Sequence, residues 1–257
     1  MSLYRGMDRV ALDAAYNNSA AVANSAQVVA GWQARSDRLR PSSRELSYGK
    51  AERNRIDLFE ATSGAPLLVF IHGGYWQMRA KENFSFLAAG PLAHGISVAL
   101  VGYTLAPEER LDGIVAEVRA ALDFLDRELV VSGWSAGGHL TAMAMTHPRV
   151  KAGLAISGIF DLEPIRLCYL NEKLRLDEAE ARRNSPILQP ASGKPLMLAY
   201  GTGELPELQR QSEDCARALA GSRICPLAGH DHFSILEELA SPSGALTALA
   251  RTLLGAA

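Results

Sequence analysis

The chain has 257 residues, of which 48% are hydrophobic and 21% charged, a composition typical of a globular domain with a sizeable core. Its 26 basic and 28 acidic residues leave a formal net charge of −2. Because nucleic acids are usually bound by a strongly basic face, this balance argues against a nucleic-acid-binding protein.

The order of the expected elements indicates the fold class. The first 50 residues, rich in Ala, Arg and Ser, have only weak helical periodicity, and we expect them to wrap a single domain that spans residues 1–257. Buried strands are expected at 67–71, 97–103, 129–131, 150–156, 196–200 and 223–225. Helices are expected at 114–125, 136–145, 177–183, 233–239 and 245–254. This alternation predicts an α/β fold, the α/β-hydrolase fold, with a mainly parallel central sheet flanked by helices.

The alternation is interrupted between residues 161 and 194. This stretch contains the short helix at 177–183, for which Asp177 is the expected N-cap. An insertion between two core strands lies over one edge of the sheet, so we predict a small cap that forms a wall of the substrate pocket.

A candidate nucleophile follows the strand expected at 129–131. Gly133-Trp-Ser-Ala-Gly137 matches the pattern G-x-S-x-G, in which a serine occupies a cramped turn between a strand and a helix. A helix is expected directly after it, as this turn requires. The sequence therefore predicts that Ser135 is the nucleophile of a hydrolase.

A glycine pair follows the strand expected at 67–71. Acyl transfer needs backbone N–H groups that point at the developing oxyanion, and glycines let the backbone come close to the substrate. We predict that Gly73 and Gly74 form this oxyanion hole with the N–H of Ala136, and Tyr75 could replace one of the two loop donors. His72 is expected to brace the loop by a hydrogen bond.

The base of such a hydrolase is a histidine that follows the acid along the chain. His230 and His232 both come after the last expected strand, and His232 is preferred because it lies nearer the start of the next helix. Asp231, between them, is interpreted as a turn residue.

The acid should follow the strand expected at 196–200 and orient the imidazole. The first carboxylate there is Glu204, which we predict to be the third member of the triad. Glu207 and Asp161 remain as alternatives.

The cysteines and the N-terminus bear on cofactors and location. Cys168, Cys215 and Cys225 are far apart and lack CxxC spacing, so neither a metal site nor any other cofactor is expected. The first residues do not resemble a signal peptide, and no apolar run approaches the roughly 18 residues that a membrane span needs. We expect a cytoplasmic protein that acts on a small molecule, with no membrane partner, as a monomer or a homodimer.

Three motifs together resemble the hormone-sensitive-lipase-related branch of the α/β-hydrolases. They are His72-Gly-Gly-Tyr-Trp76, Tyr103-Thr-Leu-Ala-Pro-Glu108 and Gly133-Trp-Ser-Ala-Gly-Gly-His139. Within this branch, the Tyr-Trp end of the first motif, Pro206-Glu-Leu-Gln-Arg-Gln-Ser212 and Asp231-His-Phe233 are similar to the kynurenine formamidase (arylformamidase) family.

The resemblance implies a set of roles for the matching residues. It places the family's nucleophile on Ser135, its base on His232 and its oxyanion loop on Gly73 and Gly74. Its triad aspartate falls on Glu204, which is a departure from the family pattern.

The expected function is hydrolysis of a small-acyl amide or ester through an acyl-enzyme, as in a kynurenine formamidase. Tyr75, Trp76 and Trp134 are the predicted substrate contacts, since their rings could lie against an aromatic leaving group. A general short-chain carboxylesterase and a non-catalytic binding protein of the same fold are the alternatives.

Overall fold

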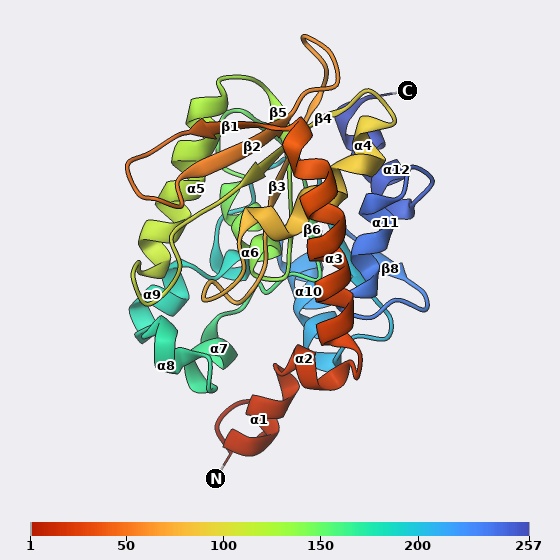
Figure 1. Ribbon diagram of the computed structural model, residues 1–257. Helices are drawn as coiled ribbons and strands as arrows, with labels where there is room; N and C mark the ends of the chain where they lie inside the picture. The colour runs from red at the N-terminus through yellow and green to blue at the C-terminus, as the bar shows by residue number, and fades with distance from the viewer. Residues whose placement is uncertain (1, 257) are drawn as a thin grey trace.

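The computed structural model describes residues 2–256 and consists of one eight-stranded sheet with helices on both faces (Figure 1). The strands are β1 (Arg44–Ser47), β2 (Arg55–Phe59), β3 (Leu67–Ile71), β4 (Ser97–Val101), β5 (Leu129–Trp134), β6 (Val150–Ile156), β7 (Leu196–Gly201) and β8 (Ser222–Leu227). Their order across the sheet is β1-β2-β4-β3-β5-β6-β7-β8. All neighbours from β4 to β8 are parallel, whereas β2 is antiparallel to both β1 and β4. The predicted fold class is confirmed.

The α-helices lie between and around these strands. They are α1 (Arg9–Ala15), α2 (Asn18–Ala21), α3 (Ser25–Leu39), α4 (Ala89–Leu92), α5 (Leu111–Leu125), α6 (Ala136–Ala144), α7 (Glu163–Leu167), α8 (Asn171–Leu174), α9 (Glu178–Arg183), α10 (Pro206–Ala218), α11 (Glu237–Ala240) and α12 (Ala245–Leu254). Four 3₁₀ segments, η1 (Arg40–Ser42), η2 (Lys81–Ala88), η3 (Pro186–Leu188) and η4 (Ser234–Leu236), complete the chain. None of the helices within residues 2–256 has the length and apolar character that crossing a bilayer would demand.

Two separate hydrophobic cores lie on the two faces of the sheet. Because side chains alternate along a strand, Leu67, Val69 and Ile71 of β3 enter one core, while Leu68 and Phe70 enter the other. The first core is covered by α5, α6 and α10, and the second by α3, η2 and α12. Burial on both faces explains why β3 appears in the sequence as a continuous apolar run.

The N-terminal segment contributes to the second core. Helix α3 packs along η2, where the ring of Trp32 is stacked on Phe86 at 5.6 Å and meets Trp134 edge-on at 5.5 Å. Helix α3 thus packs against residues that lie far along the chain from it.

Strands β1 and β2 were not expected from the sequence. Strand β1 is a short edge strand, Arg-Glu-Leu-Ser, with charged and largely exposed side chains, so it lacks the apolar signal of the buried strands. The helix predicted at 233–239 is divided into η4 and α11. The expected helix at 177–183 is present as α9, and the side chain of Asp177 accepts a hydrogen bond from the N–H of Glu180 as its N-cap.

The sheet topology brings distant parts of the sequence to one edge. In parallel strands the carboxyl ends lie together, and Ile71 of β3 is in register with Gly133 of β5. The loops after β3, β5, β7 and β8 therefore meet at the edge where α/β sheets usually bind their ligands.

Candidate active site

Ser135 occupies the sharp turn between β5 and α6. Its backbone angles are φ 57° and ψ −117°, a conformation that is rare for a residue with a side chain. The turn fits because Gly137 has no side chain: a Cβ there would lie 1.9 Å from the carbonyl oxygen of Ile71. The strained turn raises Ser135 Oγ above the carboxyl edge of the sheet, as a nucleophile elbow does.

His232 connects the serine to a carboxylate. Its Nε2 lies 3.1 Å from Ser135 Oγ, and its Nδ1 lies 2.9 Å from Glu204 Oε2. The three residues are almost fully buried, with 2%, 3% and 5% of their surfaces exposed for Ser135, His232 and Glu204. The other candidate base, His230, is 3.3 Å from Glu238 and has no contact with the serine.

Glu204 is held in place by two further hydrogen bonds. Its Oε1 accepts one from the hydroxyl of Ser157 at 2.6 Å and one from the N–H of Gly201 at 2.7 Å, which leaves Oε2 for the histidine. These two donors fix the orientation of the carboxyl group, so that Oε2 holds the imidazole with its Nε2 toward the serine.

The two alternative acids have other partners. Glu207 pairs with Arg210 at 2.7 Å, and Asp161 accepts a hydrogen bond from Tyr4 at 2.7 Å. Asp231 forms a turn, in which its Oδ1 accepts hydrogen bonds from the N–H groups of Phe233 and Ser234. Of the carboxylates considered from the sequence, only Glu204 contacts His232.

The loop after β3 runs directly beside the serine. A Cβ on Gly73 would lie 3.0 Å from the Cβ of Ser135, and Gly74 has φ +111°. Among the described residues, no acceptor takes a hydrogen bond from the backbone N–H groups of Gly73, Gly74, Tyr75 or Ala136. Free N–H groups beside a nucleophile are what an oxyanion hole requires.

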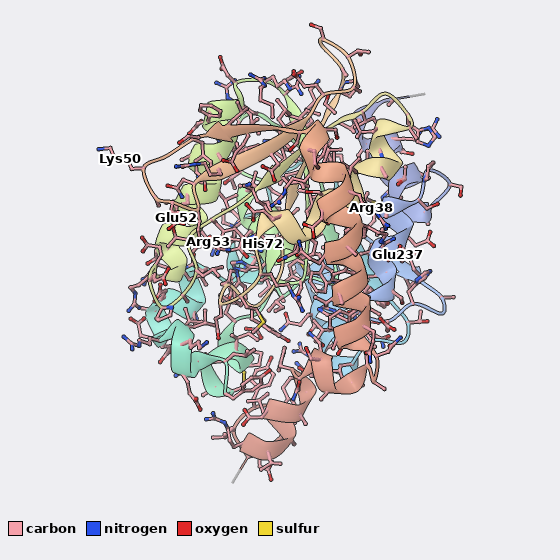
Figure 2. All side chains as sticks on the ribbon, viewed as in Figure 1. Arg38, Lys50, Glu52, Arg53, His72 and Glu237 are labelled. Atoms are coloured by element: carbon pink, nitrogen blue, oxygen red, sulfur yellow. The ribbon has the colours of Figure 1, made fainter. Side chains whose placement is uncertain are left out.

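His72 supports this loop from below. Its Nδ1 lies 2.8 Å from the carbonyl oxygen of Gly73, and its ring is stacked on that of Tyr103 at 4.2 Å. Burial lowers the pKa of His72 to about 4, so the ring is neutral at pH 7. This geometry fits a bracing residue and not a proton shuttle, and Figure 2 shows His72 near the middle of the molecule.

The three aromatic residues proposed as substrate contacts differ in position. Tyr75 and Trp134 line a small pocket of about 30 Å³ together with Ser135 and His232. Trp76, in contrast, is fully buried and meets the ring of His139 edge-on at 4.9 Å, so its position corresponds to core packing and not to a substrate contact.

Trp134 also contacts His232. Its Nε1 donates a hydrogen bond of 2.7 Å to the backbone carbonyl oxygen of His232, and the two rings are 4.9 Å apart. The residue before Ser135 thus holds the loop that carries the histidine.

The remaining pocket walls come from the N-terminus and from the loop after β3. The other lining residues are Asn18, Ser19, Gly74, Met78, Arg79 and Phe233. The segment 161–194 supplies none of these residues, although the carbonyl oxygen of Leu170 accepts a hydrogen bond from Gln77 at 2.8 Å. In this conformation the segment supports the loop from outside, whereas the sequence had suggested that it forms a wall of the pocket.

Several residues of this site, Ser157, Asn18 and Arg79 among them, were not identified from the sequence. Ser157 follows the buried strand β6 at the same sheet edge, a position that could have drawn attention to it. Asn18 and Arg79 carry no comparable sequence signal, because their place in the pocket depends on how distant segments pack.

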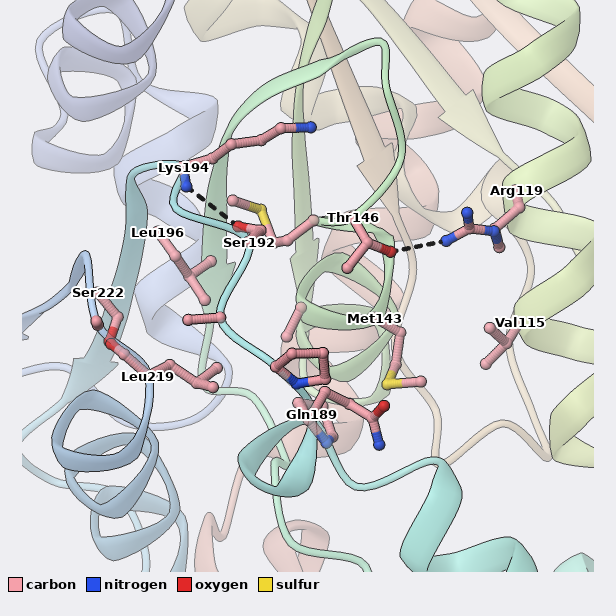
Figure 3. Close-up of a pocket in the computed structure, with 16 residues that line it drawn as sticks. Val115, Arg119, Met143, Thr146, Gln189, Ser192, Lys194, Leu196, Leu219 and Ser222 are labelled. Atoms are coloured by element: carbon pink, nitrogen blue, oxygen red, sulfur yellow. Dashed lines mark hydrogen bonds between the residues drawn. The ribbon is translucent and has the colours of Figure 1, made fainter.

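A second pocket, of about 250 Å³, lies away from the serine (Figure 3). Arg119 donates a hydrogen bond to Thr146 there at 3.1 Å, and Leu196 and Ser222 mark the start of β7 and β8. It therefore lies at the amino edge of the sheet. None of its lining residues belongs to the Ser135–His232–Glu204 relay, and residues 2–256 hold no cluster of three metal-ligating side chains.

Comparisons with known proteins agree with this architecture. Residues 57–161 match the family model BD-FAE. A crystal structure from Silicibacter sp., described as that of a candidate thioesterase, superposes with a TM-score of 0.87 at 32% identity over 93% of this chain and 98% of that one. An esterase from the archaeon Pyrobaculum calidifontis has a TM-score of 0.72 over 90% of this chain and 93% of its own, and its 17% identity shows the shared fold alone.

Curated relatives extend the similarity over most of the chain. The kynurenine formamidase of Danio rerio is 33% identical over 82% of this chain and 81% of its own length. That of Salmo salar is also 33% identical, over 82% and 81%. The chain is a hydrolase-fold protein of the esterase and amidase class, and it belongs to the kynurenine formamidase family of α/β-hydrolases.

Proposed function

We propose that this protein hydrolyses small-acyl amides by serine catalysis, and that an N-formyl anilide such as N-formylkynurenine is its preferred type of substrate. The observation that carries the proposal is the buried relay from Ser135 through His232 to Glu204 beside unpaired loop N–H groups. The similarity to kynurenine formamidases over about four fifths of the chain supports the choice of substrate.

The relay supports acylation in a defined order. His232 Nε2 takes the proton of Ser135 as its oxygen attacks the substrate carbonyl, and the tetrahedral oxyanion binds to the N–H groups of Gly73, Gly74 and Ala136. Protonated His232 then gives its proton to the leaving amine, and the acyl group stays on the serine as an ester. Glu204 stabilises the imidazolium between these two steps.

Deacylation uses the same two proton transfers through His232, with water as the attacking group. His232 removes a proton from the water that attacks the acyl-serine ester, and it returns that proton to Ser135 Oγ as the carboxylic acid leaves. For a formyl group the products are formate and the free arylamine.

The dimensions of the pocket favour a small acyl group. Its volume of about 30 Å³ is roughly the share of one water molecule in the liquid. A formyl group needs little more space, whereas a long acyl chain would have to displace Trp134 or Phe233, which are 2% exposed and packed. The leaving group would extend toward Met78, whose side chain is 47% exposed at the pocket mouth.

Two measurements test the proposal. The first is covalent labelling by a fluorophosphonate, which we expect for the native protein but not for Ser135→Ala, with the exposed Ser42→Ala as the matched control. An unlabelled native protein would favour a non-catalytic role.

The second measurement compares substrates. We expect kcat/KM for N-formylkynurenine to exceed that for 4-nitrophenyl acetate. A reversed preference by tenfold or more would assign the protein to the short-chain carboxylesterases.

A further inference from the structure

Arg79 stands out among the residues that line the catalytic pocket. It shares this lining with Ser135 and His232, and its side chain is partly buried. Within residues 2–256 its guanidinium makes no hydrogen bond or ion pair, and burial is the sole influence on its pKa, which is lowered. A partly desolvated cation without a partner is costly, so it is usually matched by an anion at some stage of function.

The backbone of Arg79 is fixed in an unusual conformation. Its φ is +71°, in the left-handed region, and its carbonyl oxygen accepts a hydrogen bond from the guanidinium of Arg53. Arg53 is anchored in turn, since its Nε donates to the carbonyl oxygen of Tyr103 at 3.0 Å. Figure 2 labels Arg53 close to His72, beneath the same loop. Arg79 thus lines the pocket from an anchored backbone, and no residue of the described chain pairs with its guanidinium.

Asn18 gives a second, independent indication of a ligand. The hydroxyl of Tyr75 donates its single proton to the carbonyl oxygen of Tyr16 at 2.6 Å, so it must accept from Asn18 Nδ2 at 2.9 Å. This fixes the orientation of the amide and leaves Asn18 Oδ1 as an acceptor. Asn18 is 4% exposed and lines the pocket, yet its Oδ1 has no partner among the described residues.

The pocket therefore offers one positive charge and one buried acceptor near the nucleophile. Its lining residues include no carboxylate, so no acidic group of the pocket wall competes for Arg79. Because the pocket volume beside Ser135 is about 30 Å³, we place the charged group of the substrate on its leaving-group half, toward the exposed Met78.

We propose that Arg79 determines specificity by binding a carboxylate on the leaving-group half of the substrate, and that Asn18 Oδ1 accepts a hydrogen bond from an N–H group on the same half. This inference rests on the proposed function, which supplies the substrate class, and it adds the two residues that would select the substrate. Arginine suits the role because its planar fork binds a carboxylate through two parallel hydrogen bonds.

The test uses a matched pair of substrates, N-formylkynurenine and 2-formamidoacetophenone, which lacks the amino-acid carboxylate. Charge-assisted bonds contribute enough to binding that Arg79→Gln should lower the ratio of kcat/KM for the charged over the neutral substrate by about 10- to 100-fold, mainly through KM. Arg79→Lys should restore part of this ratio. The control is Arg38→Gln on the exposed surface of α3, labelled in Figure 2, which should leave the ratio unchanged.

If Arg79→Gln lowered kcat/KM for both substrates by the same factor, or left both values unchanged, the role of Arg79 in specificity would be overturned. The role of Asn18 is tested with two variants. Asn18→Leu removes the acceptor Oδ1, whereas the control Asn18→Asp keeps it. Only Asn18→Leu should lose the preference for substrates that carry the N–H donor, and an equal loss of this preference in both variants would show that Asn18 serves packing alone.

The role of Arg79 can also be measured if neither formamide is hydrolysed, which would contradict the proposed function alone. Kynurenine and 2-aminoacetophenone are then compared as competitive inhibitors of 4-nitrophenyl acetate hydrolysis. Kynurenine should inhibit the native protein at least tenfold more strongly than the neutral amine, and Arg79→Gln should abolish this difference. Equal inhibition of the native protein by both amines would overturn the carboxylate site.

Discussion

The indole N–H of Trp134 donates a hydrogen bond of 2.7 Å to the backbone carbonyl oxygen of His232. These residues are 98 positions apart. Trp134 precedes Ser135 at the end of β5, and His232 lies in the loop after β8. The bond therefore helps to hold this loop, with the imidazole of His232, beside the serine.

We expect Trp134→Phe to lower kcat by about tenfold, because the loss of one hydrogen bond of roughly 1 kcal/mol lets the loop of His232 move from the serine. Single-turnover acylation would measure this. The control is Trp32→Phe, which removes another indole N–H, 3.3 Å from Glu237 and outside the relay. Equal losses of kcat in both variants would contradict a role in positioning the base.

The role of Glu204 as the acid is tested by replacing two neighbouring glutamates in turn. Glu204→Gln keeps the size of the side chain but removes the charge that stabilises the imidazolium, so we expect kcat to fall by about 10³- to 10⁴-fold. Glu207→Gln removes a partner of Arg210 instead and should change kcat by less than about threefold. If the second variant were the inactive one, the assignment of the acid would be wrong.

Ser157 acts on the reaction only through Glu204. Ser157→Ala removes the 2.6 Å hydrogen bond to Oε1, so the carboxyl group is held less firmly toward His232. We expect kcat to fall by about tenfold at unchanged KM, because the substrate-binding residues stay in place.

The matched control for this variant is Ser132→Ala, a fully buried serine on β5 whose hydroxyl has no partner among the described residues. It should leave kcat unchanged. Equal losses of kcat in Ser157→Ala and Ser132→Ala would limit Ser157 to a structural role.

The two fully buried histidines predict how stability depends on pH. Burial lowers the pKa of both His72 and His139 from 6.5 to about 4. Between these values the unfolded chain binds protons that the folded chain does not, so stability is complete above about pH 6.5 and is lost as the pH falls toward 4.

Each of these histidines can contribute on the order of 3 kcal/mol to this loss. Urea unfolding at pH 7 and pH 4.5 measures the difference. His139→Gln should reduce it, whereas His94→Gln on the surface should not, and an unchanged difference for His139→Gln would show that other groups cause the pH dependence.

The parts of the site that could be predicted from sequence are those with a local geometric requirement. A serine on a strand-to-helix turn needs glycines around it, and an oxyanion loop needs glycines after a buried strand, so Ser135, Gly73 and Gly74 are visible as short motifs. His232 and Glu204 follow their strands and could be ranked by chain order. The structure places both in hydrogen-bonding distance of one another, at 2.9 Å.

Residues whose role depends on contacts between segments could not be predicted. Trp76 looked like a substrate contact beside Tyr75, but successive residues of the tight loop point in different directions, and its ring lies in the core. The edge strand β1 was not predicted because its exposed, charged residues do not form a periodic pattern of hydrophobic positions.

The sequence by itself determined the parallel strands at the centre of the sheet, the turn that carries Ser135 and the glycine loop, because these depend on local periodicity and on backbone angles that few residues can adopt. The tertiary structure alone decided which carboxylate faces His232, since Glu204, Glu207 and Asp161 differ in their partners and not in their chemistry. It also brought Asn18 and Arg79 to the same pocket from segments 61 positions apart, by the packing of the N-terminal helices onto the loop after β3.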